Sequence, residues 1–157
     1  MPPSHNDFLQ RAVALALDNV GAGGGPFGAL IVRDGQVIAE GVNRVTQVND
    51  PTAHAEIVAI REACRALNRF QLDNCAIYAS CEPCPMCLGA IYWARLGAVY
   101  FAATREDAAS AGFDDSLIYS EMPLDPGERK IAMRRVALPG STAPFLAWAR
   151  HAGRIPY

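Results

Sequence analysis

Apolar positions recur along the chain at spacings that distinguish helices from strands. Residues 6–20 carry apolar side chains at helical spacing, from Phe8 through Ala12 to Ala16. The glycine run at 21–25 is expected to end this helix, because glycine adopts the left-handed geometry of a helix stop without strain. The run lacks the lysine and the Ser/Thr of a Walker phosphate loop and follows a helix, so it is not interpreted as a phosphate site.

The rest of the chain alternates between strand and helix patterns. Two apolar runs over residues 27–41 flank Asp34-Gly35, a strong turn signal, and predict a β-hairpin. Short apolar runs predict strands over 75–80, 97–103 and 131–138. Helical spacing predicts helices over 54–67, 84–96, 105–112 and 143–153. This alternation favours parallel pairing, so we expect an α/β domain with helices on both faces of a mixed sheet.

Size and charge narrow the possible functions. The 157 residues suit a single domain that can bury a core without disulfides or metal. With 14 basic and 16 acidic residues, a large nucleic-acid surface is not expected. The sequence has no apolar run of membrane-spanning length and no signal-peptide pattern, so we expect a cytoplasmic protein without a membrane partner. The five cysteines are then thiols or metal ligands rather than disulfides.

The segment CEPCPMC at 81–87 indicates a metal or redox site. Cys84 and Cys87 lie three positions apart at the start of a predicted helix, so their side chains share one face. The positive end of the helix dipole favours the thiolate, which is the form that binds zinc. A redox pair and a ferredoxin cluster are the alternatives, but the expected position of the fourth ferredoxin cysteine holds Ile91.

His54 is the candidate third ligand, because it opens a predicted helix and has a carboxylate, Glu56, two residues further on. One histidine and two cysteines leave one position of a tetrahedral zinc ion open, which is the mark of a catalytic site. Glu56 is not needed as a ligand and could move protons. The pattern His-x-Glu followed by Pro-Cys-x-x-Cys is that of zinc-dependent base deaminases.

Three segments carry a wider resemblance: PTAHAEIVAIR at 51–61, SCEPCPMCLGAIYWA at 80–94 and AGFDDS at 111–116. With them the chain resembles the cytidine deaminase superfamily and, within it, the small zinc-dependent guanine deaminases of bacteria, over nearly its whole length. The resemblance implies a three-layer αβα fold with a five-stranded mixed sheet, a bound Zn²⁺ ion and a homodimer. It also implies that the C-terminal helix and tail, about 142–157, form a lid or are exchanged between subunits.

The resemblance assigns roles to individual residues. The zinc ligands would be His54, Cys84 and Cys87, with Glu56 as the proton shuttle. Asn43 would hydrogen-bond the base, and Asp115 would contact the purine edge and assist proton transfer. Phe27 and Trp93 would line the pocket or stack on the base, and Tyr157 would belong to the lid.

Each substrate contact also has a purely structural alternative. Asn43 could cap a turn, and Phe27 and Trp93 could be core aromatics. Asp114 or Asp115 could cap a helix that begins near residue 116, and motif alignment alone favours Asp115 as the functional one.

The reaction that these expectations predict is hydrolysis of guanine to xanthine and ammonia, with a purine base as the small-molecule partner. A tRNA adenosine deaminase shares the zinc motif but would need a basic surface for phosphates. A deaminase of another amino-substituted ring, such as a triazine or a pterin, is closer in chemistry. A zinc-stabilised binding module is the non-enzymatic alternative, and it would leave Glu56 without a role.

Overall fold

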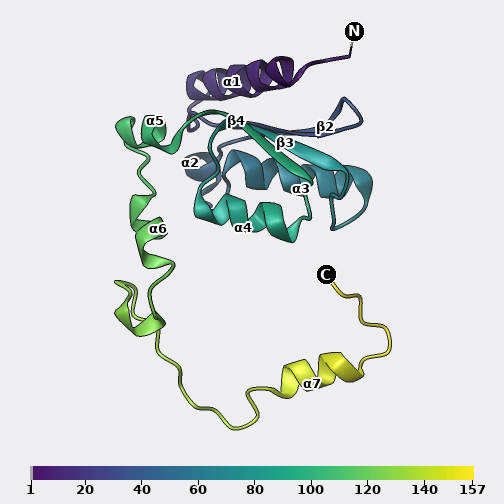
Figure 1. Cartoon of the computed structure of the whole chain (residues 1–157), viewed down its shortest axis with the longest axis vertical. Helices are drawn as coiled ribbons and strands as arrows, with labels where there is room; N and C mark the ends of the chain where they lie inside the picture. The colour runs from purple at the N-terminus through teal and green to yellow at the C-terminus, as the bar shows by residue number, and fades with distance from the viewer. Residues whose placement is uncertain (1) are drawn as a thin grey trace. The chain divides into compact units, whose positions relative to one another are not determined.

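A computed structural model describes residues 2–157 (Figure 1). Its helices and strands follow the chain as α1 (His5–Gly21), β1 (Gly28–Arg33), β2 (Gln36–Val42), α2 (Val45–Val48), α3 (Ala55–Leu67), β3 (Cys75–Cys81), α4 (Pro85–Trp93), β4 (Ala98–Ala103), α5 (Arg105–Ser110), α6 (Ser116–Glu121), a 3₁₀ helix (Pro126–Glu128) and α7 (Ala143–Arg150). The chain divides into two compact units, one that ends at Asp115 and one that spans Ser116–Tyr157.

A mixed sheet with the strand order β2-β1-β3-β4 organises the first unit. β1 pairs antiparallel with both β2 and β3, whereas β3 and β4 are parallel. The predicted hairpin and the predicted strand–helix–strand crossover are therefore confirmed. The predicted five-stranded sheet is wrong for this chain, because the sheet has four strands and residues 131–138 form none. A strand needs a neighbour to satisfy its backbone groups, and the unit of residues 116–157 offers 131–138 no other strand.

Helices cover both faces of the sheet, as the sequence predicts (Figure 1). The face under α1 buries Phe8, Ala12, Leu30, Val32 and Tyr78. The face under α3 and α4 buries a second cluster that includes Ala29, Ile31, Ala55, Ala59, Ile77 and Ile91. Neighbouring residues of β1 thus point to opposite faces, which is the two-residue period of a strand. Among the described residues, no helix has the length and apolar character needed to cross a membrane.

Two glycines let the helices approach the sheet closely. A Cβ at Gly41 in β2 would lie 2.1 Å from the carbonyl oxygen of Ala55, at the start of α3. A Cβ at Gly28 in β1 would lie 2.4 Å from the carbonyl oxygen of Ala12 in α1. Because no other residue fits such contacts, Gly41 fixes how near the N-terminus of α3 comes to the sheet.

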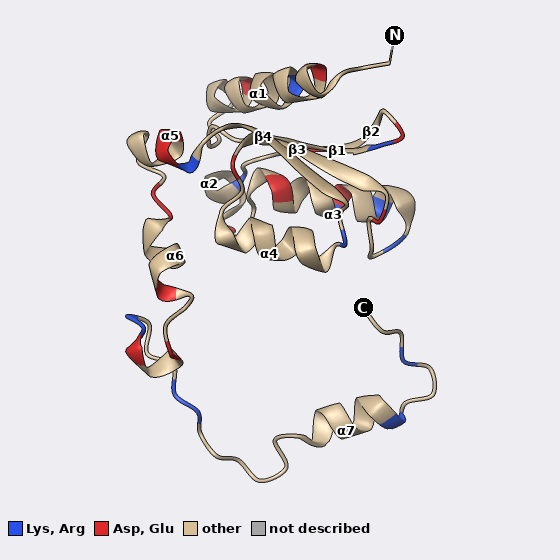
Figure 2. Cartoon of the chain, viewed as in Figure 1, with Lys and Arg blue, Asp and Glu red and all other residues tan. Residues whose placement is uncertain are grey.

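Charges of both signs are distributed along the chain (Figure 2). Three arginines spaced four apart, two on α3 and one just beyond its end, each form an ion pair: Arg61 with Asp50, Arg65 with Glu62 and Arg69 with Asp73. These pairs make the arginine stripe a solvated, charge-balanced face.

The second unit, residues 116–157, is held together by local hydrogen bonds. The Arg129 guanidinium donates to the carbonyl oxygens of Met122 and Leu124, both at 3.1 Å. None of the residues 116–157 is buried. The exposed large apolar side chains of this unit are Leu117, Ile118, Met122, Ile131, Met133, Val136, Leu138, Phe145, Leu146, Trp148, Ile155 and Tyr157. This unit has no hydrophobic core of its own.

Candidate metal centre and active site

The start of α3 supplies His54 and Glu56. His54 is the N-cap residue, with extended backbone angles of φ −67° and ψ 155°, and its carbonyl accepts the N–H of Val58 at 2.9 Å. Glu56 lies in the first turn of the helix and is only 7% exposed. Because His54 precedes the first helical residue and has extended backbone angles, its side chain does not follow the helical spacing. A histidine and a carboxylate two residues apart can therefore serve one site.

The start of α4 supplies the two cysteines. Cys84 is its N-cap residue, and Pro85 occupies the first turn, where its missing N–H leaves no hydrogen bond unmade. Cys87 lies one turn further on and is fully buried. The predicted placement of both cysteines at a helix N-terminus is confirmed.

The side chains of His54, Cys84 and Cys87 converge on one point. His54 Nδ1 lies 3.6 Å from Cys84 Sγ and 3.5 Å from Cys87 Sγ. All three potential ligand atoms lie within 4.8 Å of one another. Tetrahedral zinc with bond lengths of about 2.3 Å to sulfur and about 2.0–2.1 Å to nitrogen separates these atoms by about 3.6 Å. The three donors therefore fit a zinc ion, with Nδ1 as the histidine ligand.

Hydrogen bonds and burial shift the pKa values of the three donors. A hydrogen bond from the Cys87 thiol and a second one from His54 lower the pKa of Cys84 to about 4. The same hydrogen bond to Cys84, together with burial, raises the pKa of Cys87. The hydrogen bond with Cys84 also raises the pKa of His54. A lowered pKa favours the thiolate at Cys84, which is the form that binds zinc, and metal binding at Cys87 would release its proton.

Glu56 lies beside the three donors without being one of them. Its Oε2 lies 3.4 Å from Cys87 Sγ, within hydrogen-bond distance. Burial, aided by the negative charge of Cys84, raises the pKa of Glu56 above its ordinary value. A carboxyl group with a raised pKa holds a proton more readily than an exposed one, which suits proton transfer at neutral pH.

The residues predicted to contact the substrate differ in their burial and in the contacts that they make. Asn43, 8% exposed, follows β2, and its Oδ1 accepts the backbone N–H of Val45 at 3.3 Å. Phe27 is partly buried and packs edge to face against Phe113 at 5.0 Å between ring centres. Asp115 is half-buried, and burial together with the charge of Cys84 raises its pKa.

Trp93 and Tyr157 are the two remaining residues predicted to contact the substrate. Trp93 ends α4 and is 65% exposed. Tyr157 belongs to the second unit and is 71% exposed. Their predicted roles remain predictions.

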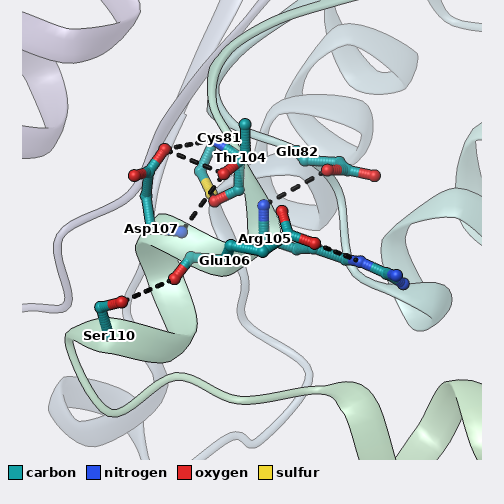
Figure 3. Close-up of polar contacts among 7 residues, drawn as sticks. All are labelled: Cys81, Glu82, Thr104, Arg105, Glu106, Asp107 and Ser110. Atoms are coloured by element: carbon teal, nitrogen blue, oxygen red, sulfur yellow. Dashed lines mark hydrogen bonds and ion pairs between the residues drawn. The ribbon is translucent and has the colours of Figure 1, made fainter.

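A polar network around the end of β3, which the sequence analysis did not find, supports the cysteine loop (Figure 3). Cys81 Sγ donates to the carbonyl oxygen of Thr104 at 3.4 Å, and Glu82 accepts the backbone N–H of Arg105 at 3.2 Å. Thr104 and Asp107 form a capping box at the start of α5. The hydrogen bonds of Cys81 and Glu82 thus connect the segment just before Cys84 to the start of α5, the helix that precedes Asp115. The spacing Thr-x-x-Asp in TRED was the available sequence signal.

Comparison with known proteins agrees with this geometry. The family described as the cytidine and deoxycytidylate deaminase zinc-binding region matches residues 2–103. The chain is 58% identical over 155 residues to the guanine deaminase of Bacillus subtilis, covering 98% of this chain and 99% of that protein. The crystal structure of a guanine deaminase from the same species superposes with a TM-score of 0.97, at 58% identity and over 99% of both chains.

More distant relatives share only part of the chain. The tRNA-specific adenosine deaminase of Aquifex aeolicus is 44% identical over 96 residues, which cover 61% of this chain and 64% of that protein. A variant of another relative, solved in complex with 8-azaguanine, is 35% identical with a TM-score of 0.70, over 73% of this chain and 66% of that one. The family match over residues 2–103 and the near full-length relative show that the chain belongs to the family of zinc-binding cytidine and deoxycytidylate deaminases.

Proposed function

We propose that this protein is a guanine deaminase, which hydrolyses guanine to xanthine and ammonia with Zn²⁺ as its metal. The observation that carries the proposal is the convergence of His54, Cys84 and Cys87 beside the buried carboxyl of Glu56. Near full-length similarity to a guanine deaminase supports guanine as the substrate. A zinc ion held by these three side chains would supply Lewis acidity and would lower the pKa of a water molecule to about 7.

Glu56 performs the proton transfers in this proposal. Its carboxylate takes a proton from the attacking water molecule as the oxygen bonds to C2 of guanine. It gives that proton to a ring nitrogen, then takes the second water proton and delivers it to the amino group as the C2–N bond breaks. A buried carboxyl with a raised pKa is suited to both directions of transfer.

Asn43 and Asp115 recognise the base. Because Val45 occupies Oδ1 of Asn43, the amide presents its NH₂ group, which can donate to an acceptor on guanine. Asp115 accepts from guanine N–H groups, whereas adenine has an acceptor at N1. A site built from such hydrogen bonds rejects mismatched bases strongly. Phe27 and Trp93 line the pocket in this arrangement.

A homodimer with exchanged C-terminal segments completes the proposal. Residues 116–157 expose twelve large apolar side chains and bury none, and an apolar surface of this kind is stabilised by covering it with a partner. β4 lies at the edge of the sheet, where a further strand can pair, and residues 131–138 of a second copy are suited to that edge. Tyr157 would then close the partner's site.

Mixing two defective variants tests the exchange. Glu56→Gln damages the chemistry of its own chain, and Tyr157→Ala damages the lid. In an exchanged heterodimer, the site with Glu56 intact receives Tyr157 from the other chain, so mixing after mild unfolding restores activity. If each tail closes its own site, every site in the mixture keeps one defect and activity stays low.

Substrate comparison tests the proposed activity itself. The zinc-loaded protein is offered guanine, a tRNA anticodon stem-loop with adenosine at the target position, and a panel of aminopurines, pyrimidines, triazines and pterins, and ammonia is measured. We expect guanine to be the preferred substrate. The balanced charges and the ion-paired Arg61, Arg65 and Arg69 argue against the tRNA substrate. Faster release from another member of the panel would refute guanine as the substrate.

The proposed location is the cytoplasm. All five cysteines are free thiols, which is the form that persists in a reducing compartment.

A further inference from the structure

Asn19, near the end of α1, is buried and uses both hydrogens of its side-chain amide. It is 6% exposed. Its Nδ2 donates to the carbonyl oxygen of Gly25 at 2.8 Å and to that of Asn43, also at 2.8 Å. These two acceptors lie six and 24 residues away along the chain. A single side chain on α1 therefore joins the glycine loop to the segment that carries the base-binding asparagine.

These contacts belong to a closed ring of hydrogen bonds. The carbonyl of Gly25 accepts a second bond from the backbone N–H of Phe27 at 2.9 Å. The carbonyl of Phe27 accepts the backbone N–H of Asn43 at 3.1 Å. The ring runs through Asn19, Gly25, Phe27 and Asn43 and back to Asn19. It therefore includes two of the predicted substrate contacts.

Close packing explains why this loop is rich in glycine. A Cβ at Gly24 would lie 2.3 Å from Nδ2 of Asn19. A Cβ at Gly25 would lie 2.8 Å from both Cγ and Oδ1 of Asn43. Both distances are far below normal contact, so a side chain at either position would displace one of the two asparagines. The loop thus presses directly against the amide that would meet the base.

We infer that Asn19 is a positioning residue for base recognition, which acts through Asn43 and Phe27 with the glycine loop as its support. The inference rests on the proposed function, in which Asn43 donates to guanine. Asn19 orders the backbone on both sides of the recognition site, and Val45 fixes Oδ1 of Asn43. Loss of Asn19 leaves the Asn43 carbonyl without this donor and the Gly25 carbonyl with the Phe27 N–H alone, so the backbone that carries Asn43 is held less firmly.

Two variants test this role, one by changing Asn19 itself and one by changing the glycine loop. Asn19→Ala removes both donated hydrogen bonds, whereas Gly25→Ala keeps Asn19 and pushes on the Asn43 side chain. Asp18→Asn, in the same turn of α1 but exposed, is the matched control. We expect the KM for guanine to rise about tenfold in the first two variants, the change that loss of one good hydrogen bond produces. We expect kcat, zinc content and the control to change by less than twofold.

A double-mutant cycle separates positioning from general destabilisation. If Asn19 acts largely through Asn43, the rise in KM of Asn19→Ala combined with Asn43→Ala is smaller than the product of the rises in the two single variants. Additive effects, or a KM within twofold of wild type in both Asn19→Ala and Gly25→Ala, would overturn the inference. Melting temperatures identify a variant that fails to fold, in which case Gly25→Ala decides the question.

The wild-type assay keeps this test apart from the proposed function. If the wild type prefers another amino-substituted ring, guanine is wrong as the substrate, and the same cycle is measured on the preferred ring. If the wild type deaminates nothing, a crystal structure of Asn19→Ala decides. A shift of residues 24–27 and of the Asn43 side chain supports the inference, and an unchanged arrangement refutes it.

Discussion

Replacing Glu56 with glutamine tests the division of labour between the metal ligands and the proton shuttle. Glutamine has the same shape as glutamate and can keep the contact with Cys87 Sγ, seen at 3.4 Å. It cannot take a proton at neutral pH. General acid–base transfer contributes about 10²–10⁴-fold, or about 2.7–5.4 kcal/mol of barrier, so kcat should fall by that factor. The zinc content should stay at one ion per chain, because Glu56 is not among the three donors.

The assay is ammonia release from guanine, with zinc measured on the same samples. Glu62→Gln is the control, because Glu62 is an exposed acid on the same helix, paired with Arg65. We expect it to retain activity within twofold. A Glu56→Gln variant with near wild-type kcat would refute the shuttle, and one that lost its zinc would show that Glu56 holds the metal.

The buried carboxyl has a second consequence in the metal-free protein. Its folded-state pKa lies above the ordinary value of 4.5, so the unfolded chain ionises first as the pH rises. The contribution of Glu56 to the free energy of unfolding therefore declines between pH 4.5 and its folded-state pKa, by about 1.4 kcal/mol for each pH increment of one across that window. Glu56→Gln lacks this ionisable group. The difference in free energy of unfolding between the variant and the wild type, measured in urea, should therefore shift in favour of the variant from pH 4 to pH 7. A gap that stays constant with pH would contradict the raised pKa.

Three further changes test the ligands, the base contact and the packing. Cys87→Ser should lose tight zinc binding, measured by competition with a chelator, because a hydroxyl replaces a fully buried sulfur donor; retention of wild-type affinity would exclude Cys87 as a ligand. Asp115→Asn should erode the preference for guanine over other aminopurines in kcat/KM, and unchanged selectivity would remove Asp115 from the base edge. Gly41→Ala should lower the free energy of unfolding by about 1–3 kcal/mol or more in urea, since its Cβ would lie 2.1 Å from the Ala55 carbonyl. Gly21→Ala, with nothing within 4 Å, should be neutral or stabilising by roughly 0.5–1 kcal/mol, and equal losses in both would refute the packing argument.

The metal centre was predictable from sequence because each half of it is local. His54 and Glu56 share the start of one helix, and Cys84 and Cys87 share the start of another. Residue type and short spacing were therefore sufficient to define both halves, and the family resemblance connected them.

Features that depend on distant contacts were harder to predict. The apolar pattern of residues 131–138 indicates a strand but does not say which strand it pairs with, so a fifth strand was wrongly expected within the chain. Asn19 sits in a helix with no special spacing, and its importance lies in two backbone carbonyls elsewhere. The glycine run was interpreted as a helix terminator, whereas Gly24 and Gly25 also make room for buried asparagines.

Anomalous diffraction at the zinc edge, from crystals of the zinc-loaded protein, tests the central claim most directly. We predict one peak per chain, within bonding distance of His54 Nδ1, Cys84 Sγ and Cys87 Sγ, with no fourth protein ligand and with the Glu56 carboxylate close by but unbound. A peak elsewhere, or a fourth side chain bonded to the ion, would contradict this prediction.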